Sequence, residues 1–168
     1  MTDFSITLAT AADLAAINDI YNYYVLNSTC TYQTLPETPV ARRAWFDCHG
    51  PVHPVTVLRT AHNGENIIAG WGSLSPFHPR AAFGRTVENS VYIHHDHHRK
   101  GFGKAILADL LLRAKTLGHH TIIAAIDSMQ TSSIALHNGF GFKTTGELKE
   151  AGYKFNSWLN LVYMQYMV

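Results

Sequence analysis

Cysteine is scarce in this sequence, long apolar runs are absent, and neither sign of charge predominates. The two cysteines, Cys30 and Cys48, lack CxxC spacing, which argues against a disulfide framework and a thiolate metal site. No apolar run approaches the roughly 18 residues of a membrane span, and residues 1–4 lack the basic and apolar segments of a signal peptide. The formal net charge of +1 shows no bias toward nucleic acid or an acidic membrane surface. We therefore expect a cytoplasmic protein with reduced thiols and no nucleic-acid or membrane partner.

The length and composition are those of one globular unit. The chain has 168 residues, 46% of them hydrophobic, which is enough for one well-formed core and hardly enough for two. It contains no internal repeat, low-complexity tract or linker. We therefore expect residues 1–168 to form a single domain.

Hydrophobic periodicity predicts alternating strands and helices. A variant of the capping box at 10–13 precedes apolar residues at helical spacing up to Val25. The dipeptide Asn63-Gly64 predicts a hairpin. The expected helices cover residues 14–25, 40–48, 103–116 and 132–138, and the expected strands cover 6–8, 55–58, 67–71, 87–93, 121–126, 143–148 and 159–167. This order predicts an α/β fold with a mixed sheet.

The turn Gly101-Phe102-Gly103 lies between an expected strand and a long expected helix. Glycines in that position let backbone N–H groups approach an anion, and the helix N-terminus adds a positive partial charge. Basic side chains flank the turn: Arg99, Lys100 and Lys104. The spacing is too short for a Walker P-loop, and a Rossmann unit would have a third glycine where Ile106 stands. Read alone, the turn indicates either a phosphate site or a tight connection.

A strand, this short glycine turn and an amphipathic helix together resemble motif A of the GNAT acyltransferase superfamily. The segments Glu88–Ile93, Ser133–His137 before Gly141-Phe142, and Gly152–Trp158 resemble the phosphinothricin acetyltransferase-like branch. These motifs extend from Trp71 to the C-terminus. The resemblance implies a GNAT fold, with a mixed, mostly antiparallel central sheet of about six to seven strands flanked by about four helices.

The resemblance also implies that the loop amides hold the pyrophosphate of acetyl-CoA. The residues that it assigns to acetyl-CoA are Val91, Tyr92, Ile93, Arg99, Lys100, Gly101, Phe102, Gly103, Lys104, Gln130 and Ser133. Two positions depart from the family pattern. His98 occupies the usual Gln or Arg position, and Gln130 stands where an Asn usually contacts the pantetheine arm. Both substitutions retain hydrogen-bonding capacity.

Glu88 and His137 are the candidate catalytic residues. Strand alternation places Glu88, Ser90 and Tyr92 on one face, so that Glu88 can line a cleft. The matching family glutamate is the general base, whereas an isolated glutamate is more often solvated or salt-bridged. His137 stands where the superfamily often has a tyrosine acting as general acid; the alternative is an ordinary hydrogen-bonded histidine.

The run His94–His98 invites interpretation as a metal site. Adjacent imidazoles bind metals opportunistically. The run has no HExxH pattern and no well-spaced third ligand, and it leads directly into the glycine turn. We therefore expect a solvated turn and no functional metal.

The resemblance implies transfer to the α-amine of a small amino acid or analogue, of the phosphinothricin, methionine sulfoximine or methionine sulfone type. Such an acceptor needs a cation for its carboxylate or phosphinate, because a guanidinium binds these groups with two hydrogen bonds. The candidates for substrate binding are Arg80 and Arg85 as cations, Tyr32 and Phe77 as an aromatic wall, and Lys154 within a family motif. For each, surface charge or core packing is the alternative.

Two other functions stay open. The first is acetylation of another amine, such as an antibiotic, a polyamine or a protein N-terminus; the basic loop around Arg80 argues against a polyamine. The second is a CoA-binding module without catalysis, which the presence of both Glu88 and His137 disfavours. Family members are commonly homodimers, so the resemblance also implies a homodimer.

Overall fold

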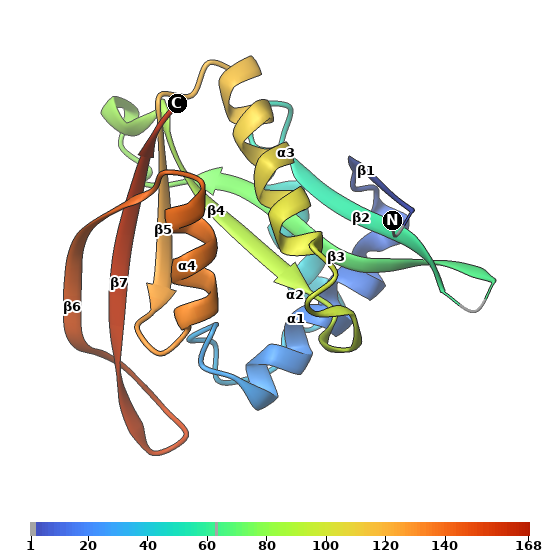
Figure 1. Ribbon diagram of the computed structural model, residues 1–168, viewed down its shortest axis with the longest axis horizontal. Helices are drawn as coiled ribbons and strands as arrows, with labels where there is room; N and C mark the ends of the chain where they lie inside the picture. Colours follow the sequence, from blue (N-terminus) through green and yellow to red (C-terminus); the bar gives the residue numbers. More distant parts are fainter. Residues whose placement is uncertain (1–2, 63) are drawn as a thin grey trace.

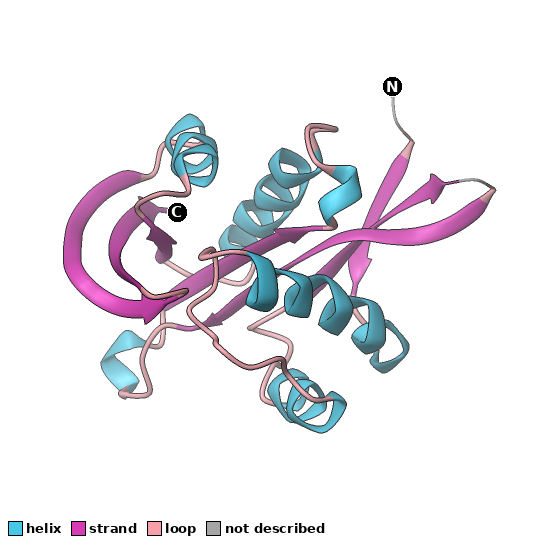
Figure 2. Ribbon diagram, turned by 90° about the horizontal axis from the view of Figure 1, so that it is seen from below, coloured by secondary structure: helices cyan, strands magenta, loops and turns pink. Residues whose placement is uncertain are grey.

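The computed structural model describes residues 3–62 and 64–168. Within these ranges, seven strands form one sheet in the order β1-β2-β3-β4-β5-β7-β6, and four α-helices cover its two faces (Figures 1 and 2). The strands are β1 (Phe4–Leu8), β2 (Val55–His62), β3 (Glu65–Pro76), β4 (Thr86–Ile93), β5 (Thr121–Asp127), β6 (Lys143–Lys154) and β7 (Ser157–Met167). The helices are α1 (Leu14–Asn27), α2 (Pro39–Asp47), α3 (Phe102–Thr116) and α4 (Thr131–Gly139). The expected mixed α/β fold is confirmed.

One face of the sheet is covered by α3 and α4. The buried stripe of α3 packs on β3 and β4 in a cluster that also contains Phe142 and Met164. Gly72 of β3 permits this close approach, because a Cβ there would lie 2.5 Å from Ile106 Cγ2 and 3.0 Å from Leu110 Cδ1. The position of the α3 N-terminus therefore depends on tight helix–sheet packing.

The opposite face is covered by α1 and α2. Ile17 and Ile20 of α1 pack with Val55, Val57 and Trp71 in a second apolar cluster. The expected capping box is present at residues 10–13, where the Asp13 carboxylate accepts a hydrogen bond from the Thr10 N–H at 2.8 Å. No helix in the described part of the chain is long and apolar enough to cross a membrane.

The functional geometry starts at the junction of β4 and β5. These strands are parallel, whereas the other neighbouring strands of the described sheet are antiparallel. They pair only between Thr86–Glu88 and Thr121–Ile123. Beyond Glu88, β4 continues to Ile93 and β5 to Asp127 without pairing to each other. The sheet therefore opens immediately after Glu88.

Two hairpins differ in length from their sequence-based expectations. β2 and β3 pair from Val55↔Ser73 to His62↔Glu65, which confirms the first hairpin, although Asn63 of the expected turn lies outside the described residues. β6 continues to Lys154, beyond the expected end at 148. A two-residue turn, with φ of 51° at Phe155 and 58° at Asn156, then leads into β7. Neither residue is a glycine, so the usual glycine signature of a hairpin turn is absent there.

Candidate active site

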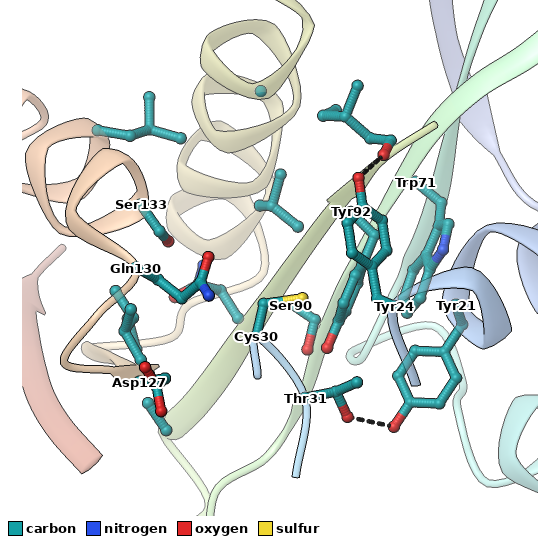
Figure 3. A pocket seen from close by; sticks show the side chains of 18 of the residues that line it. Tyr21, Tyr24, Cys30, Thr31, Trp71, Ser90, Tyr92, Asp127, Gln130 and Ser133 are labelled. Atoms are coloured by element: carbon teal, nitrogen blue, oxygen red, sulfur yellow. Dashed lines mark hydrogen bonds between the residues drawn. The ribbon is translucent and has the colours of Figure 1, made fainter. Parts of the chain in front are cut away.

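A cleft of about 1020 Å³ occupies the opening between β4 and β5. Figure 3 shows its interior, with Tyr92 and Trp71 on one side and Gln130 and Ser133 on the other. Most of the residues expected at the site line it: Tyr32, Glu88, Val91, Tyr92, Ile93, Arg99, Gly101, Phe102, Gly103, Gln130, Ser133 and His137. The fold therefore gathers residues from both halves of the chain around the point where the strands part.

Strand β4 divides the cleft into two sides. Val91 and Ile93 pack against the cluster under α3, whereas Tyr92 packs with the cluster under α1 and α2. This packing confirms the expected alternation, which places Glu88 on the same side as Tyr92. The Tyr92 ring stacks on Trp71, with centroids 4.8 Å apart. Tyr92 therefore lines the cleft from the α1 and α2 side.

The backbone of β4 presents N–H groups to the opening. The N–H of His94 donates to the Ala69 carbonyl of β3 at 2.9 Å. Because successive N–H groups of a strand point to opposite edges, those of Val91 and Ile93 point away from β3, toward the opening. The N–H of Tyr92 points to β3, so of the three residues expected to bind acetyl-CoA on this strand, Val91 and Ile93 offer their backbone N–H groups to the opening. The Tyr24 hydroxyl donates to the Ile93 carbonyl, which closes one end of the opening.

Glu88 is half-buried at the base of the cleft. Among the described residues, its carboxylate has no hydrogen-bond or ion-pair partner. Burial raises the pKa of Glu88 because desolvation penalises the charged form. An unpaired carboxyl group with a raised pKa in a cleft is suited to accepting a proton.

His137 lies on α4, on the opposite side of β4 from the Glu88 side chain, and is buried. Burial lowers its pKa, so the ring is neutral near neutral pH. Nδ1 lies 2.8 Å from the Ser133 carbonyl and must donate to it, which leaves Nε2 to accept from the Asn89 side-chain amide at 2.9 Å. The Asn89 Oδ1 is buried and has no partner in the described structure. His137 thus fixes the orientation of the Asn89 side-chain amide.

The glycine turn forms the N-terminal end of α3. Gly101 precedes the helix with φ of 81°, a left-handed conformation that favours glycine. A Cβ on Gly103 would be 3.5 Å from its nearest neighbour, Leu136 Cδ2, so this position is not crowded by the fold. Arg99 lines the cleft beside the turn, whereas Lys100 and Lys104 are exposed outside its lining. The first-turn N–H groups of α3 are available to an anion.

The histidine run divides into parts with different surroundings. His94, His95 and Asp96 bring one ligand atom each within 4.8 Å of one another, and all three are partly or fully exposed. His97, by contrast, is only 3% exposed, and its Nδ1 lies 2.8 Å from Lys100 Nζ. His98 is hydrogen-bonded through Nε2 to the Tyr24 hydroxyl. The run therefore contains a short 3-10 turn, His95–His97, that is solvated as expected except at the buried His97.

Tyr32 is held firmly at the wall formed by β5 and β7. Its hydroxyl donates toward Asp127 Oδ2 at 3.1 Å and the Asn160 carbonyl at 3.0 Å. Burial raises its pKa, so it stays protonated. Gly152 of β6 lies under the ring, where an added Cβ would be 2.6 Å from Tyr32 Cδ2. Tyr32 therefore lines the cleft in a fixed orientation.

Lys154 lies beneath the same segment of the chain. It is 4% exposed, and its ammonium group donates to the carbonyls of Ser28 (2.7 Å) and Thr31 (2.8 Å). Burial lowers its pKa. Lys154 does not line the cleft and instead fastens the segment that carries Cys30 and Tyr32 to the β6–β7 hairpin.

Three residues expected to bind substrate lie away from the cleft. Arg80 and Arg85 are exposed on the connection between β3 and β4 and are not part of its lining. Phe77 lines a separate cavity of about 240 Å³ with Ile123 and Tyr163. Within a single chain, the structure does not bring these side chains to Glu88.

Asn89 and Arg42 are among the polar residues of the cleft that the sequence interpretation missed. Asn89 follows Glu88 directly, and alternation alone would have placed it on the opposite side of the strand. Arg42 precedes Trp45 by three residues on α2, a spacing that puts both on one helix face. Neither signal indicates a ligand until the surrounding strands are placed.

Comparison with known proteins places this cleft among acetyltransferases. Residues 17–142 match the family described as Acetyltransferase (GNAT) family. The L-amino acid N-acyltransferase MnaT of Escherichia coli is 36% identical over 161 residues, covering 96% of this chain and 92% of that protein. The L-methionine sulfoximine/L-methionine sulfone acetyltransferase of Pseudomonas aeruginosa PAO1 is 39% identical over 162 residues, with the same coverage.

Solved structures agree over the whole chain. A GNAT superfamily phosphinothricin acetyltransferase from Sinorhizobium meliloti, in complex with acetyl-CoA, superposes with a TM-score of 0.93 at 35% identity, covering 100% of this chain and 89% of that one. yncA from Salmonella typhimurium, with its cofactor acetyl-CoA, gives a TM-score of 0.91 at 34% identity, covering 99% and 94%. The aligned regions include the residues on both sides of the cleft.

Proposed function

The chain belongs to the GNAT acetyltransferase family and is an acetyl-CoA-dependent N-acetyltransferase, and on that premise we propose that its acceptor is the α-amine of a small amino acid or amino-acid analogue. The relatives that support this acceptor act on L-amino acids, on methionine sulfoximine and methionine sulfone, and on phosphinothricin, by their names. These acceptors share an α-amine and an α-carboxylate. The observation that carries the proposal is the unpaired Glu88 carboxyl group at the point where β4 leaves β5.

The residues on the α3 and α4 side fit acetyl-CoA. The α3 N-terminus and Arg99 suit the pyrophosphate, because N–H groups and a guanidinium bind phosphate oxygens. The N–H groups of Val91 and Ile93 point toward the opening and suit the pantetheine and acetyl carbonyls. We propose Gln130 and Ser133 as further contacts from the opposite wall.

We propose that Glu88 is the general base. Acetyl-CoA, when bound, would supply the acetyl group: the C–N bond forms, the thioester C–S bond breaks, and CoA leaves as a thiolate that takes up a proton from solvent. Glu88 takes a proton from the amine nitrogen, directly or through one water, because only a neutral amine has a free electron pair. A carboxyl group with a raised pKa is better matched to this task than an ordinary glutamate. The N–H groups of Val91 and Ile93 stabilise the negative charge that develops on the carbonyl oxygen.

We assign His137 to positioning Asn89. Its Nδ1 proton is donated to Ser133, and its Nε2 electron pair is occupied by the Asn89 amide, so the neutral ring has no proton to give to the cleft. Burial lowers its pKa and so disfavours a second proton near neutral pH. For His137 to act as a general acid, the hydrogen bond from the Asn89 amide to Nε2 would have to break, so that Nε2 could carry a proton.

His137→Gln is expected to lower turnover less than about tenfold and to leave the alkaline side of the pH–rate profile unchanged. The reason is that glutamine retains an acceptor near Asn89, whereas loss of a general acid lowers turnover by about 10²–10⁴-fold. Steady-state rates across pH, with Asn138→Ala as the exposed control on the same helix, measure the effect. A hundredfold loss together with a changed alkaline limb would show that His137 donates a proton.

A thiol-release assay with acetyl-CoA tests the acceptor. The panel contains phosphinothricin, methionine sulfoximine, methionine sulfone, unmodified amino acids and spermidine. We expect turnover with one or more of the amino-acid compounds and none with spermidine. Turnover of spermidine without turnover of any amino-acid compound would overturn the proposed acceptor while leaving the acetyltransferase assignment in place.

We propose further that residues 1–168 act as one domain and pair with a second copy through the β6–β7 hairpin. Tyr153, Phe155 and Trp158 are large apolar side chains that this hairpin exposes, and exposed apolar patches mark association surfaces. Sedimentation is expected to give twice the mass of the chain, and Trp158→Asp to shift the protein toward the single chain. A single chain at micromolar concentration for the unmodified protein would contradict the dimer.

A further inference from the structure

The histidine run contains a group of side chains that the proposed acetyl transfer does not use. His94 follows the last residue of β4, and His95 and Asp96 begin the 3-10 turn that leads toward the glycine turn of α3. One possible ligand atom from each of these three residues lies within 4.8 Å of the other two. None of the three lines the cleft. The group is therefore separate from the candidate active site.

The 3-10 turn brings the carboxylate of Asp96 close to both imidazole rings. Asp96 Oδ2 lies 3.7 Å from His95 Nε2 and 4.0 Å from His94 Nδ1. Ligand atoms on one tetrahedral zinc ion are about 3.3–3.4 Å apart, because each lies about 2.0–2.1 Å from the metal. The measured separations exceed that spacing by less than about 1 Å, which rotation of the side chains can supply. The three residues can therefore reach one ion without movement of the backbone.

The ligand atoms carry electron pairs that a metal can use. The backbone N–H of Asp96 donates to His94 Nδ1 at 3.3 Å, so Nδ1 is the unprotonated nitrogen of that ring. This hydrogen bond is long, and a bond from Nδ1 to a metal would replace it. Within residues 3–62 and 64–168, His95 Nε2 and the Asp96 carboxylate accept no hydrogen bond. All three atoms are thus available to a metal ion.

Stacking and burial hold the turn in place. The His95 ring lies 3.8 Å from that of Tyr23 of α1, at an interplanar angle of 7°, and 4.4 Å from that of His94. His97 anchors the same turn from inside the protein, and its Nδ1 accepts from Lys100 Nζ. Side chains that are already ordered lose less conformational entropy when they bind a ligand. The group is therefore preorganised on the surface of the protein.

We propose that His94, His95 and Asp96 form a binding site for one divalent metal ion of the zinc class, with water completing its coordination. Two imidazoles and a carboxylate suit Zn²⁺, Ni²⁺ or Cu²⁺, whereas Mg²⁺ and Ca²⁺ need oxygen ligands. The sequence alone favoured no functional metal, because ligand spacing does not show how a turn gathers adjacent side chains. The site lies outside the cleft, so the proposal does not depend on the acceptor of the acetyl group.

Calorimetric titration with Zn²⁺ tests the site, in protein that carries no added histidine tag. The unmodified protein is compared with His95→Ala, Asp96→Asn and His120→Ala. His120 is the matched control, since it is an exposed histidine outside the group. We expect one strongly bound Zn²⁺ per chain in the unmodified protein and in the control. Affinity should fall at least about tenfold in His95→Ala and in Asp96→Asn, because loss of even an outer-shell partner of a metal costs about 10–100-fold.

Two results of this titration would overturn the site. The first is absence of Zn²⁺ binding to the unmodified protein. The second is equal affinity in all four proteins, which would show that other histidines hold the ion. Mg²⁺ in about hundredfold excess is expected not to displace Zn²⁺, since imidazole nitrogen is a poor ligand for Mg²⁺. Displacement by Mg²⁺ would contradict the proposed ligands.

A measurement on the unmodified protein keeps the test independent of any effect of substitution on folding. The imidazole resonances are followed by NMR as Zn²⁺ is added. Those of His94 and His95 should change with the first equivalent. The rings of His53 and His119, 5.7 Å apart, are the competing pair elsewhere on the protein, and their resonances should change only with excess metal. An earlier change at His53 and His119 would overturn the assignment.

Discussion

Glu88→Gln is expected to lower turnover by about 10²–10⁴-fold, the range for loss of a general base, and to leave the affinity for acetyl-CoA nearly unchanged. Glutamine has almost the same shape but cannot accept the amine proton. The contacts proposed for acetyl-CoA lie on the other side of β4 and at the α3 N-terminus, away from the Glu88 side chain. Turnover and acetyl-CoA affinity, measured separately, test this division. An equal fall in both would contradict the base assignment.

The pH dependence should change in the same variant. In the unmodified enzyme, kcat/KM rises with pH through the raised pKa of Glu88, because the base must be deprotonated. This acidic limb of the pH–rate profile should be absent in Glu88→Gln.

The same variant also tests stability. A carboxyl group whose pKa is raised in the folded state makes the protein less stable as pH rises through that pKa. Glu88→Gln should therefore be as stable as the parent, or more stable, at neutral pH. Glu147→Gln, at an exposed position on β6, is the control.

Ile106→Ala is expected to lower the free energy of unfolding by about 2–5 kcal/mol, as for other buried isoleucine truncations. Ile106 is fully buried, and its side chain lies directly over Gly70 and Gly72 of β3, where an added Cβ would be 3.1 Å and 2.5 Å from its methyl groups. Because those glycines allow α3 to lie close to the sheet, the cavity left by the truncation cannot be filled unless α3 moves. Denaturant unfolding measures the change.

Leu112→Ala is the matched control for Ile106→Ala. Leu112 belongs to the same helix but is 66% exposed, so its truncation should change stability by less than about 0.5 kcal/mol. Because α3 carries the glycine turn, Ile106→Ala should also weaken acetyl-CoA binding. Similar unfolding curves for the two variants would contradict the role of this packing.

The local parts of the site were predictable from the sequence. The turn at Gly101 and Gly103 follows from glycine spacing between a strand and a helix, and strand alternation separates Glu88 and Tyr92 from Val91 and Ile93. Each of these inferences uses neighbours within a few residues, where periodicity is informative.

The long-range parts could not be predicted in this way. The aromatic enclosure of Arg42 joins α1, α2 and β3, and no spacing within one segment encodes it. The contacts of Lys154 with Ser28 and Thr31 cross more than 120 positions. Arg80 and Arg85 have the right chemistry but lie on an exposed connection, and side-chain chemistry alone does not tell which arginine the fold turns inward.

The product of the reaction tests the central claim most directly. The enzyme is incubated with acetyl-CoA and L-methionine sulfone, and the released thiol is compared with the N-acetylated product by mass spectrometry. The account predicts one N-acetyl-L-methionine sulfone, acetylated on the α-nitrogen, for each thiol released. Release of thiol without this product, or no release with any amino-acid acceptor, would contradict it.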